Sequence, residues 1–496
     1  MVDFSRLPEP LVPGHPEWKA LYELAWTLAE AHIRTVNGRG YIDAAWDGKR
    51  NFQWVWDTCF IAFYTRYAPD RFPGIDGLDN FYELQRADGY LGMTYDMTTG
   101  LEPWPNRINP PLFAWAEWEH FRLTGDDSRL ARAVHRIGKF MEWIEANRRT
   151  APHSRLRETS GQPDPFQLFF FEDCGSSGMD DSPRTPRNPE AGAYFDWIDL
   201  SAQMALSYRM LANMAAQLDQ KAKAEAWARR GAEIGALVND ELWCAADRFY
   251  HDRMLPRNFV SAKTIAGFWP LVAGYCPAER VDDLVGHLEN RAEFARSIPV
   301  PSLAADDPNY RGDGVFWRGG VWAPANYMVL QGLAHCGRRE VAHRIARRYL
   351  EGLVRVHDVN EPHTLWENVA PDLDRPGLKP YGPGTSKPDF VGWSGLGPIS
   401  MLIEHVLGLE VDAVAGTVVW DLRLEGPHGL KRLPVGRDKQ GSPDFVDVTC
   451  EAPADDNSGP ASVTLRGTRE LKVELHRGGR TVVVRLVAGV EWTGVV

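Results

Sequence analysis

The chain has 496 residues, 44% hydrophobic and 25% charged, which is the composition of an ordinary globular protein. Its formal net charge is −12 and it has no long basic run, which argues against a nucleic-acid partner. No apolar run reaches the roughly 18 residues that cross a membrane, no secretory signal is evident, and the six cysteines are scattered without a CxxC pair. We therefore expect a cytoplasmic protein with no membrane partner, no metal and no cofactor.

The first third of the chain predicts five helices separated by loops. Apolar residues recur near the helical period, most clearly where Leu130, Val134, Ile137, Met141 and Ile144 step by four and three residues. Pro110 and Pro111 mark a helix start, and Ser128 is the expected cap of the fifth helix. The predicted helices are 18–36, 56–68, 76–87, 111–124 and 129–147.

The next part of the chain predicts seven more helices, of two kinds. The helix at 195–218 is apolar nearly all round, whereas the one at 220–242 has a single apolar stripe, which indicates an inner and an outer layer. The remaining helices are predicted at 263–274, 277–290, 322–335, 338–357 and 393–408.

Twelve helices with alternating short and long connections favour six helical hairpins closed into an (α/α)6 toroid. An open helical solenoid is the alternative, but no internal repeat of solenoid length supports it. The long loops would then gather at one rim of the ring, and they hold most of the unusual aromatic and acidic residues. These loops are 37–55, 88–110, 171–194, 291–321 and 358–392.

Near residue 410 the pattern changes to alternating and β-branched segments joined by glycine turns, as at Arg477-Gly478-Gly479. This predicts a small antiparallel β domain, most simply a sandwich packed on the helices. We expect a helical catalytic domain at 1–409 and a structural β domain at 410–496.

The loop at 171–194 cannot be helical throughout, because glycines and prolines interrupt it. It carries Asp180 and Asp181 among small polar residues, and it leads through Tyr194 into an aromatic helix start. Carboxyl groups beside flat rings suit proton chemistry on a sugar. The simpler interpretation is that one aspartate only caps a turn.

Two earlier motifs have the same character. Trp54, Trp56 and Asp57 stand at a helix start, where rings can stack on a sugar and a carboxylate can accept from its hydroxyls. The alternative, which fits the residues equally well, is that this segment only caps the helix and that its tryptophans pack in the core. Asn109 can reach a hydroxyl, although a cap before the two prolines accounts for it as well.

Two later motifs complete the set. In FWRGGVW, Arg318 lies between tryptophans, Gly319 permits close backbone approach and Trp322 adds a ring; a structural stacked arginine is the alternative. In LWEN, Trp366 precedes Glu367, whose carboxylate stands on a long loop. The alternative is that Glu367 is only a solvated surface residue. A GWS segment with a further ring at Trp393 follows.

Together the segments SGMDDSPR, FWRGGVW, WEN and GWSG resemble the clan of inverting (α/α)6 glycosidases. The similarity is to glycoside hydrolase family 63 and its bacterial relatives, including mannosylglycerate and glucosylglycerate hydrolases, and it covers roughly 18–409. The resemblance implies that Asp180 is the general acid and Glu367 the general base. Asp181 stands where many bacterial relatives carry asparagine. The resemblance also implies that sugar contacts come from Trp56, Asp57, Arg318, Trp322 and Trp393.

The sequence thus predicts an inverting α-glycosidase that acts on a small α-glucoside or related α-glycoside as its carbohydrate partner. The two carboxyl groups of an inverting enzyme lie about 6.5–9.5 Å apart. Two other classes stay open. One is an (α/α)6 epimerase or polysaccharide lyase, which typically needs paired histidines or a tyrosine with a histidine, whereas the candidate loops are poor in histidine. The other is a non-catalytic carbohydrate-binding protein. Neither the sugar, the linkage nor the oligomeric state follows from the sequence.

Overall fold

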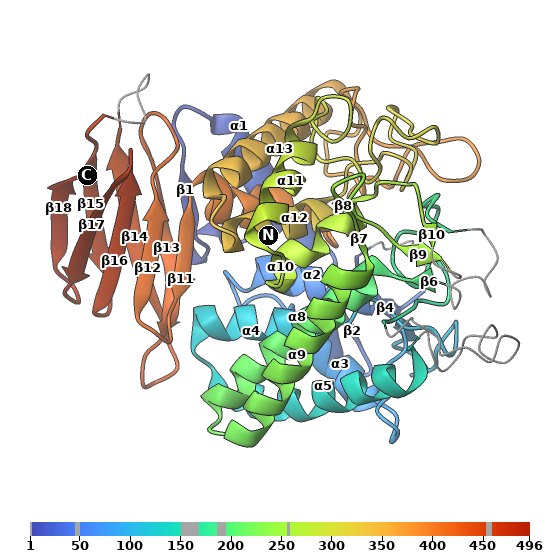
Figure 1. Ribbon diagram of the computed structural model, residues 1–496. Helices are drawn as coiled ribbons and strands as arrows, with labels where there is room; N and C mark the ends of the chain where they lie inside the picture. Colours follow the sequence, from blue (N-terminus) through green and yellow to red (C-terminus); the bar gives the residue numbers. More distant parts are fainter. Residues whose placement is uncertain (1, 45–49, 150–167, 186–194, 255–257, 453–458) are drawn as a thin grey trace, which may run out of the picture.

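The computed structural model describes residues 2–44, 50–149, 168–185, 195–254, 258–452 and 459–496. The long elements before about residue 406 are helices, and those after it are strands (Figure 1). In the described part of the chain the α-helices and the π-helical η5 are α1 (Pro16–Ala31), α2 (Val55–Thr65), α3 (Gly77–Leu84), α4 (Phe113–Thr124), α5 (Asp127–Asn147), α8 (Ile198–Gln217), α9 (Lys221–Glu241), α10 (Trp269–Ala273), α11 (Ala278–Glu289), α12 (Ala323–His335), α13 (Arg339–Val359) and η5 (Gly397–Val406).

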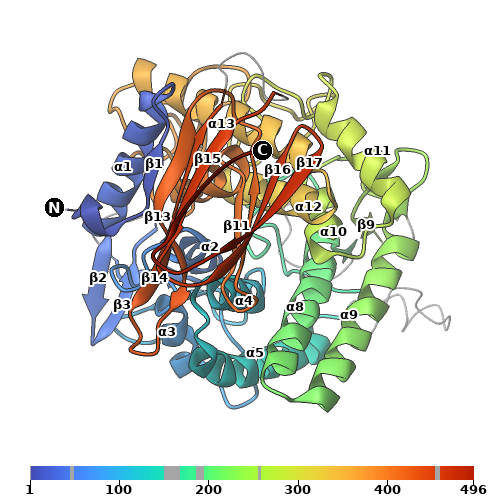
Figure 2. The ribbon, with the colours of Figure 1, turned by 90° about the vertical axis from the view of Figure 1, so that its left-hand side faces the viewer.

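The helices are of the two kinds that the sequence predicts. Every residue of α2 is buried, and α8, α10, α12 and η5 are buried almost all round. By contrast, α9 buries only a stripe of Gly231, Ile234, Gly235 and Val238, and α11 buries three residues. Figure 2 shows the helices arranged around a ring, with the C-terminal strands in front of one end. A helical ring with a β-rich C-terminal region is therefore confirmed.

Three local predictions need correction. The first helix ends at Ala31 instead of 36, because Asn37 and Gly38, both with positive φ, turn β2 (Ile33–Val36) into β3 (Arg39–Ile42). The fifth helix is capped by Asp126, not by Ser128: the Asp126 carboxylate accepts the Ser128 N–H at 3.2 Å. The predicted helix 263–274 is a 3-10 turn followed by the short α10.

Further short strands lie in segments predicted as loops. Thus β4 (Phe52–Trp54) pairs with β5 (Thr94–Asp96), which ties the start of α2 to a loop about forty residues away. The other short strands are β6 (Phe195–Asp196), β7 (Trp243–Cys244), β8 (Phe249–Tyr250), β9 (Arg253–Met254) and β10 (Asn258–Phe259). The 3-10 turns are η1 (Phe4–Arg6), η3 (Ile265–Phe268) and η4 (Ser394–Leu396).

The C-terminal region forms two sheets, in the orders β1-β13-β14-β15-β18 and β11-β12-β16-β17. Alternate side chains along β15 and β16 are buried, as expected where two sheets face each other. The strands are β1 (Glu9–Leu11), β11 (Leu409–Asp412), β12 (Thr417–Asp421), β13 (His428–Arg437), β14 (Pro443–Glu451), β15 (Ser462–Gly467), β16 (Leu471–Arg477), β17 (Arg480–Leu486) and β18 (Glu491–Val495).

Two features of these sheets differ from the predicted antiparallel domain. The pair β12 and β16 is parallel, because the chain leaves this sheet after β12, builds β13 to β15 in the other sheet, and returns in the same direction. The N-terminal strand β1 pairs with β13, so residues near the start of the chain extend a sheet made near its end. This strand is only three residues long, which is too short for an alternating polar and apolar pattern to predict it.

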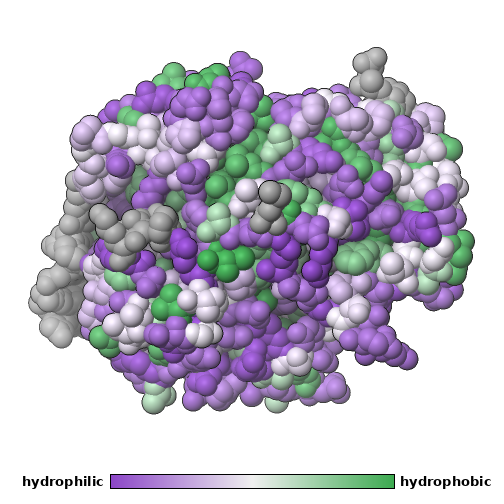
Figure 3. All heavy atoms as spheres, turned by 180° about the vertical axis from the view of Figure 1, so that it is seen from behind, coloured by the Kyte–Doolittle hydropathy of each residue, from purple (hydrophilic) through white to green (hydrophobic). Residues whose placement is uncertain are grey.

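On the face in Figure 3, hydrophilic residues cover most of the surface, with small hydrophobic patches between them. Within the described part of the chain, no helix combines the length and the apolar character that a membrane span requires.

Candidate active site

A cavity of about 370 Å³ opens at the N-terminal ends of the inner helices. Trp56 and Asp57 lie in the first turn of α2, Trp322 directly precedes α12, and Trp393 directly precedes η4. The loop that contains Asp180, which lies before α8, and the loop that contains Glu367 supply the rest of the wall. Segments more than 300 residues apart in the sequence therefore meet here because their helices run in the same direction around the ring.

The loop from Cys174 to Ser182 is a series of tight turns that presents Asp180 to the cavity. The Met179 N–H donates to the Cys174 carbonyl at 3.0 Å, and Gly178 between them has φ +80°. A Cβ on Gly178 would lie 3.3 Å from the Trp56 ring, so glycine allows the turn to pack on that indole. Asn109 donates from Nδ2 to the Ser176 carbonyl at 3.0 Å, which holds the loop from the other side.

Arg184 anchors the end of this loop in the protein interior. Its guanidinium is fully buried and bonds Asp199 at 2.6 and 3.0 Å and Asp252 at 2.6 and 2.5 Å. It also lies 4.6 Å above the Trp197 ring. Two bidentate carboxylate pairs fix one planar group from two sides, so the loop cannot shift without breaking buried charge pairs.

The two adjacent aspartates have different surroundings. Asp181 is buried: its Oδ1 accepts the Trp317 N–H at 2.8 Å, and its Oδ2 lies 3.3 Å from Arg318 Nε. Asp181 therefore ties the loop to the FWRGGVW segment and does not line the cavity. Asp180 does line the cavity and keeps an accessible carboxyl surface there.

Glu367 stands on the loop after α13 and is positioned by its neighbours' backbones. Its N–H donates to the Lys387 carbonyl at 2.9 Å, and its carboxylate accepts the Lys387 N–H at 3.3 Å. Trp393 donates from Nε1 to the Glu367 carbonyl at 2.9 Å. The carboxylate is thus attached to a short β-like ladder that leaves it on the cavity wall.

The carboxyl groups of the cavity perturb one another. Burial, then the charge of Glu367, then that of Asp181, raise the pKa of Asp180 to about 7. Asp180 has accessible surface toward the cavity, but the protein atoms around it still remove much of its hydration, and this loss is the largest cause of the shift. Burial also raises the pKa of Glu367, while the charge and the N–H of Lys387 oppose that shift. Burial, with a further contribution from Glu367, raises the pKa of Asp57.

Stacked rings form another part of the wall. Trp322 stacks on Trp317 with ring centres 4.3 Å apart and planes 3° apart, and Trp393 meets Trp322 edge-on. Elsewhere in the wall, Trp54 stacks on Trp104. Rings held by other rings present rigid apolar faces, which suit the apolar faces of a pyranose.

Most of the residues that the sequence singles out lie together in this cavity, namely Trp54, Trp56, Asp57, Asn109, Asp180, Trp322, Glu367 and Trp393. Three others, all in the described part of the chain, are not in its lining. Arg318 pairs with Asp181, Trp366 is buried behind Glu367, and Gly319 packs so that a Cβ would lie 2.6 Å from the Arg311 carbonyl. Packing therefore accounts for the glycine and the arginine. Tyr194 lies outside the described residues.

Apart from Glu367, the sequence did not single out the side chains that the loop 358–392 contributes to the wall. Lys379, Tyr381, Lys387 and Phe390 line the cavity, along with Trp317 from the FWRGGVW segment. The only signal for the first four was their place on a long loop predicted to crowd the rim.

Carboxyl groups beside stacked indoles, at one end of a ring of helices, are what a glycoside hydrolase needs, and comparison with known proteins assigns the chain to that class. Residues 50–390 match the model of the mannosylglycerate hydrolase MGH1-like glycoside hydrolase domain. The chain therefore belongs to this family of glycoside hydrolases, related to family 63.

Individual relatives are more distant. An uncharacterised protein of Borreliella burgdorferi is 23% identical over 427 residues, covering 84% of this chain and 85% of the relative. The mannosylglycerate hydrolase of Thermus thermophilus is 34% identical over 122 residues, covering 24% of this chain and 28% of the relative. A crystal structure of a family 63 mannosylglycerate hydrolase from Thermus thermophilus in complex with glucose shares the fold, with a TM-score of 0.60, 21% identity, and coverage of 77% of this chain and 99% of that one.

Proposed function

We propose that this glycoside hydrolase is an inverting α-glycosidase for a small α-glucoside or related α-glycoside, with Asp180 as general acid and Glu367 as general base. The observation that carries the proposal is that both carboxyl groups line one cavity in which burial and Glu367 raise the pKa of Asp180 to about 7. A carboxyl group that holds its proton near neutral pH beside an ionised partner is the pair that this reaction needs.

In this mechanism Asp180 gives its proton to the glycosidic oxygen as the bond to the anomeric carbon breaks. Glu367 takes a proton from a water molecule, whose oxygen bonds to the anomeric carbon from the opposite face. The products are a free sugar of inverted configuration and the protonated leaving group. Lys387, whose charge and N–H favour the ionised form of Glu367, keeps the base ready to accept that proton.

The cavity volume of about 370 Å³ is at the lower end for small-molecule sites, which favours a disaccharide-sized substrate over a polymer. Lys379 and Lys387 add positive charge to its rim. The names of the matched relatives include mannosylglycerate hydrolase, and a glycerate group is an anion. We therefore expect the leaving group to carry a carboxylate.

Replacing the rim lysine Lys379 with methionine should raise KM for an α-glycoside of glycerate by about tenfold, since one charge-assisted contact is lost. KM for a neutral substrate such as trehalose should change little. Steady-state kinetics on both substrates test this, with the exposed Lys439→Met of the β domain as control. An equal change for both substrates would show that Lys379 does not read the charge of the leaving group.

The pKa of Asp180 sets the alkaline limit of activity. Because the general acid works only when protonated, kcat/KM should fall above about pH 7, approaching tenfold per pH unit. Ionisation of Glu367 sets the acidic limit, so the profile should be bell-shaped. A kcat/KM that stays flat from neutral to alkaline pH would exclude Asp180 as the acid.

The stereochemistry is tested by a proton NMR time course with α-mannosylglycerate, α-glucosylglycerate and trehalose. Early appearance of the β-anomer supports inversion and names the sugar. Early appearance of the α-anomer means retention, and the roles of Asp180 and Glu367 would then be wrong. The lining holds no histidine among the described residues, which disfavours the epimerase and lyase alternatives.

We also propose the finer fold: α2, α4, α8, α10, α12 and η5 as inner helices of six hairpins, with α3, α5, α9, α11, α13 and α1 outside. The division near residues 409 and 410 fits the change from η5 to β11. The six free cysteines favour a reducing compartment, hence the cytoplasm.

A further inference from the structure

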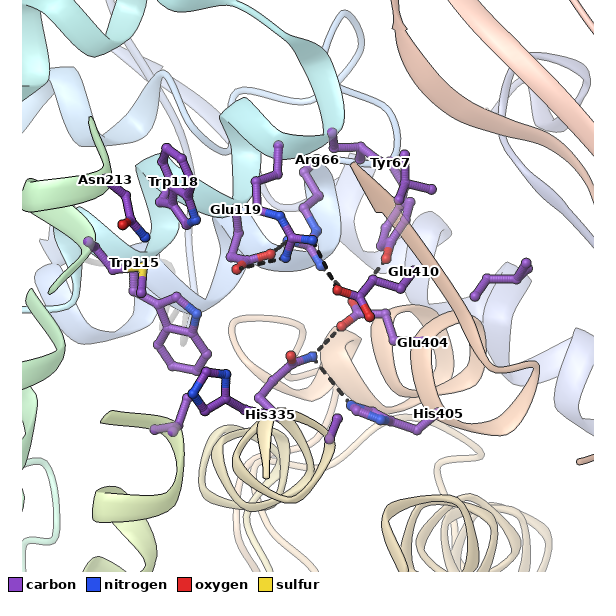
Figure 4. Close-up of a pocket in the computed structure, with 18 of the residues that line it drawn as sticks. Arg66, Tyr67, Trp115, Trp118, Glu119, Asn213, His335, Glu404, His405 and Glu410 are labelled. Carbon is purple, nitrogen blue, oxygen red and sulfur yellow. Dashed lines mark hydrogen bonds and ion pairs between the residues drawn. The ribbon is translucent and has the colours of Figure 1, made fainter. Parts of the chain in front are cut away.

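A second cavity, of about 320 Å³, lies at the opposite ends of the inner helices (Figure 4). Its wall includes Arg66 just after α2, His335 at the end of α12 and His405 near the end of η5. Strand β11 and Leu433 of β13 contribute the side toward the C-terminal sheets. We name it the base cavity, because the same helices begin at the catalytic cavity and end here. It shares no lining residue with that cavity.

The carboxylates of the base cavity are all paired with arginines. Glu404 accepts from Arg66 and Tyr67, both at 2.9 Å, and its other oxygen bonds Tyr327 and Gln331. Glu119 pairs with Arg66 at 2.9 Å.

The third carboxylate, Glu410, lies between two arginines. It accepts from Arg122 at 3.0 Å and also pairs with Arg339. Arg339 and Arg122 hold the pKa of Glu410 down to about 2, against the effect of burial. All three carboxylates of the wall are therefore already paired with arginines.

Arg209 of α8 is the fourth arginine in the wall and has a different environment. No carboxylate among the described residues lies within ion-pair distance of it. One terminal nitrogen donates to the Val272 carbonyl at 2.7 Å, and the other donates to His335 Nε2 at 3.2 Å. Burial and the charge of Arg209 lower the pKa of His335, so that ring is neutral and adds no charge. The other three arginines of the wall all pair with carboxylates, Arg122 with Asp412 as well, so Arg209 is the one cation of the described wall without an anionic partner.

The groups around Arg209 are hydrogen-bond donors and flat rings. Because His335 accepts at Nε2, its proton is on Nδ1, which can donate. The Asn213 side chain, also on α8, has no hydrogen-bond partner among the described residues. In Figure 4, Asn213 lies beside Trp118, Trp115 lies between Asn213 and His335, and Glu119 and Arg66 follow on the other side of Trp118.

From this arrangement we propose that the base cavity binds a small organic oxyanion, a carboxylate or a phosphate ester, with its charged end on Arg209, Asn213 and His335 and its body against Trp118. Unpaired donors and one arginine without a carboxylate partner complement an anion that accepts several hydrogen bonds. The volume admits a ligand of monosaccharide size and excludes a polymer. The bonds to Val272 and His335 use two of the five N–H groups of Arg209, so these two contacts alone do not account for the group.

Calorimetric titration with inorganic phosphate, glycerol 3-phosphate and benzoate, at an ionic strength fixed with chloride, tests the proposal. We expect saturable one-site binding of at least one probe. Binding of the first two assigns phosphate chemistry, and binding of benzoate assigns a carboxylate. Arg209→Gln should weaken the binding at least about tenfold, and Asn213→Leu should weaken it several-fold without a change of charge.

Two matched variants show whether the anion binds in the base cavity and not elsewhere on the protein. Arg229→Gln removes an exposed arginine from α9 and should leave binding unchanged. Lys379→Met removes the cation proposed to read an anionic group in the catalytic cavity, and it should also leave the binding unchanged. The proposal is overturned if no probe gives a saturable signal, or if the binding survives both Arg209→Gln and Asn213→Leu. If Arg209→Gln fails to fold, the Asn213→Leu result decides alone.

Discussion

Asp180→Asn and Glu367→Gln should each lower kcat on an α-glycoside by about 10²–10⁴-fold, while the sugar still binds. Asparagine cannot donate the acidic proton, and glutamine cannot accept one from water. Both replacements nearly keep the shape of the side chain, so the tryptophan wall that holds the sugar is unchanged. Initial rates and a separate binding titration with the product sugar measure the two effects.

Glu361→Gln is the matched control, since Glu361 is 81% exposed on the same loop and the charge change is the same. It should retain full activity. If either catalytic variant kept near-normal turnover, the corresponding role would have to be reassigned. If both kept binding and the parent chain showed no hydrolysis of any tested glycoside, the carbohydrate-binding alternative would replace the catalytic one.

Arg184→Met should lower the free energy of unfolding by about 3–5 kcal/mol, because it leaves the carboxylates of Asp199 and Asp252 buried without a cation. Arg184 also fixes the end of the Asp180 loop, so turnover should fall in the folded variant as well. Chemical denaturation monitored by tryptophan fluorescence measures the first effect, and steady-state kinetics the second.

Arg338→Met is the control for this change. Arg338 pairs with Asp282 at 2.6 Å, but both side chains are exposed, and an exposed pair contributes about 1 kcal/mol or less. Adding Asp199→Asn and Asp252→Asn to Arg184→Met should recover part of the lost stability, since the uncompensated charges disappear. A loss of stability no larger than that of the control would show that the buried pairs do not hold the loop.

The sequence by itself determined the helices, the change to strands near residue 410 and the motifs that resemble glycoside hydrolases. Helical and strand periodicity is a local property, so a stripe such as Leu130 to Ile144 can be recognised without knowing its neighbours. The aromatic and acidic motifs were visible for the same reason. The predicted end of the first helix was wrong because the Asn37-Gly38 pair, a local signal for a tight turn between strands, ends the helical segment earlier.

Only the tertiary structure decided which of two adjacent aspartates faces the cavity. Asp180 is directed into it, while Asp181 turns to Arg318 and the Trp317 N–H, and this depends on the positive φ at Gly178 and on how the loop packs on Trp56. Likewise, the wall from Lys379 to Phe390 and the base cavity around Arg209 arise where loops and helix ends distant in sequence converge. Such contacts depend on the packing of the whole ring, which no local pattern encodes.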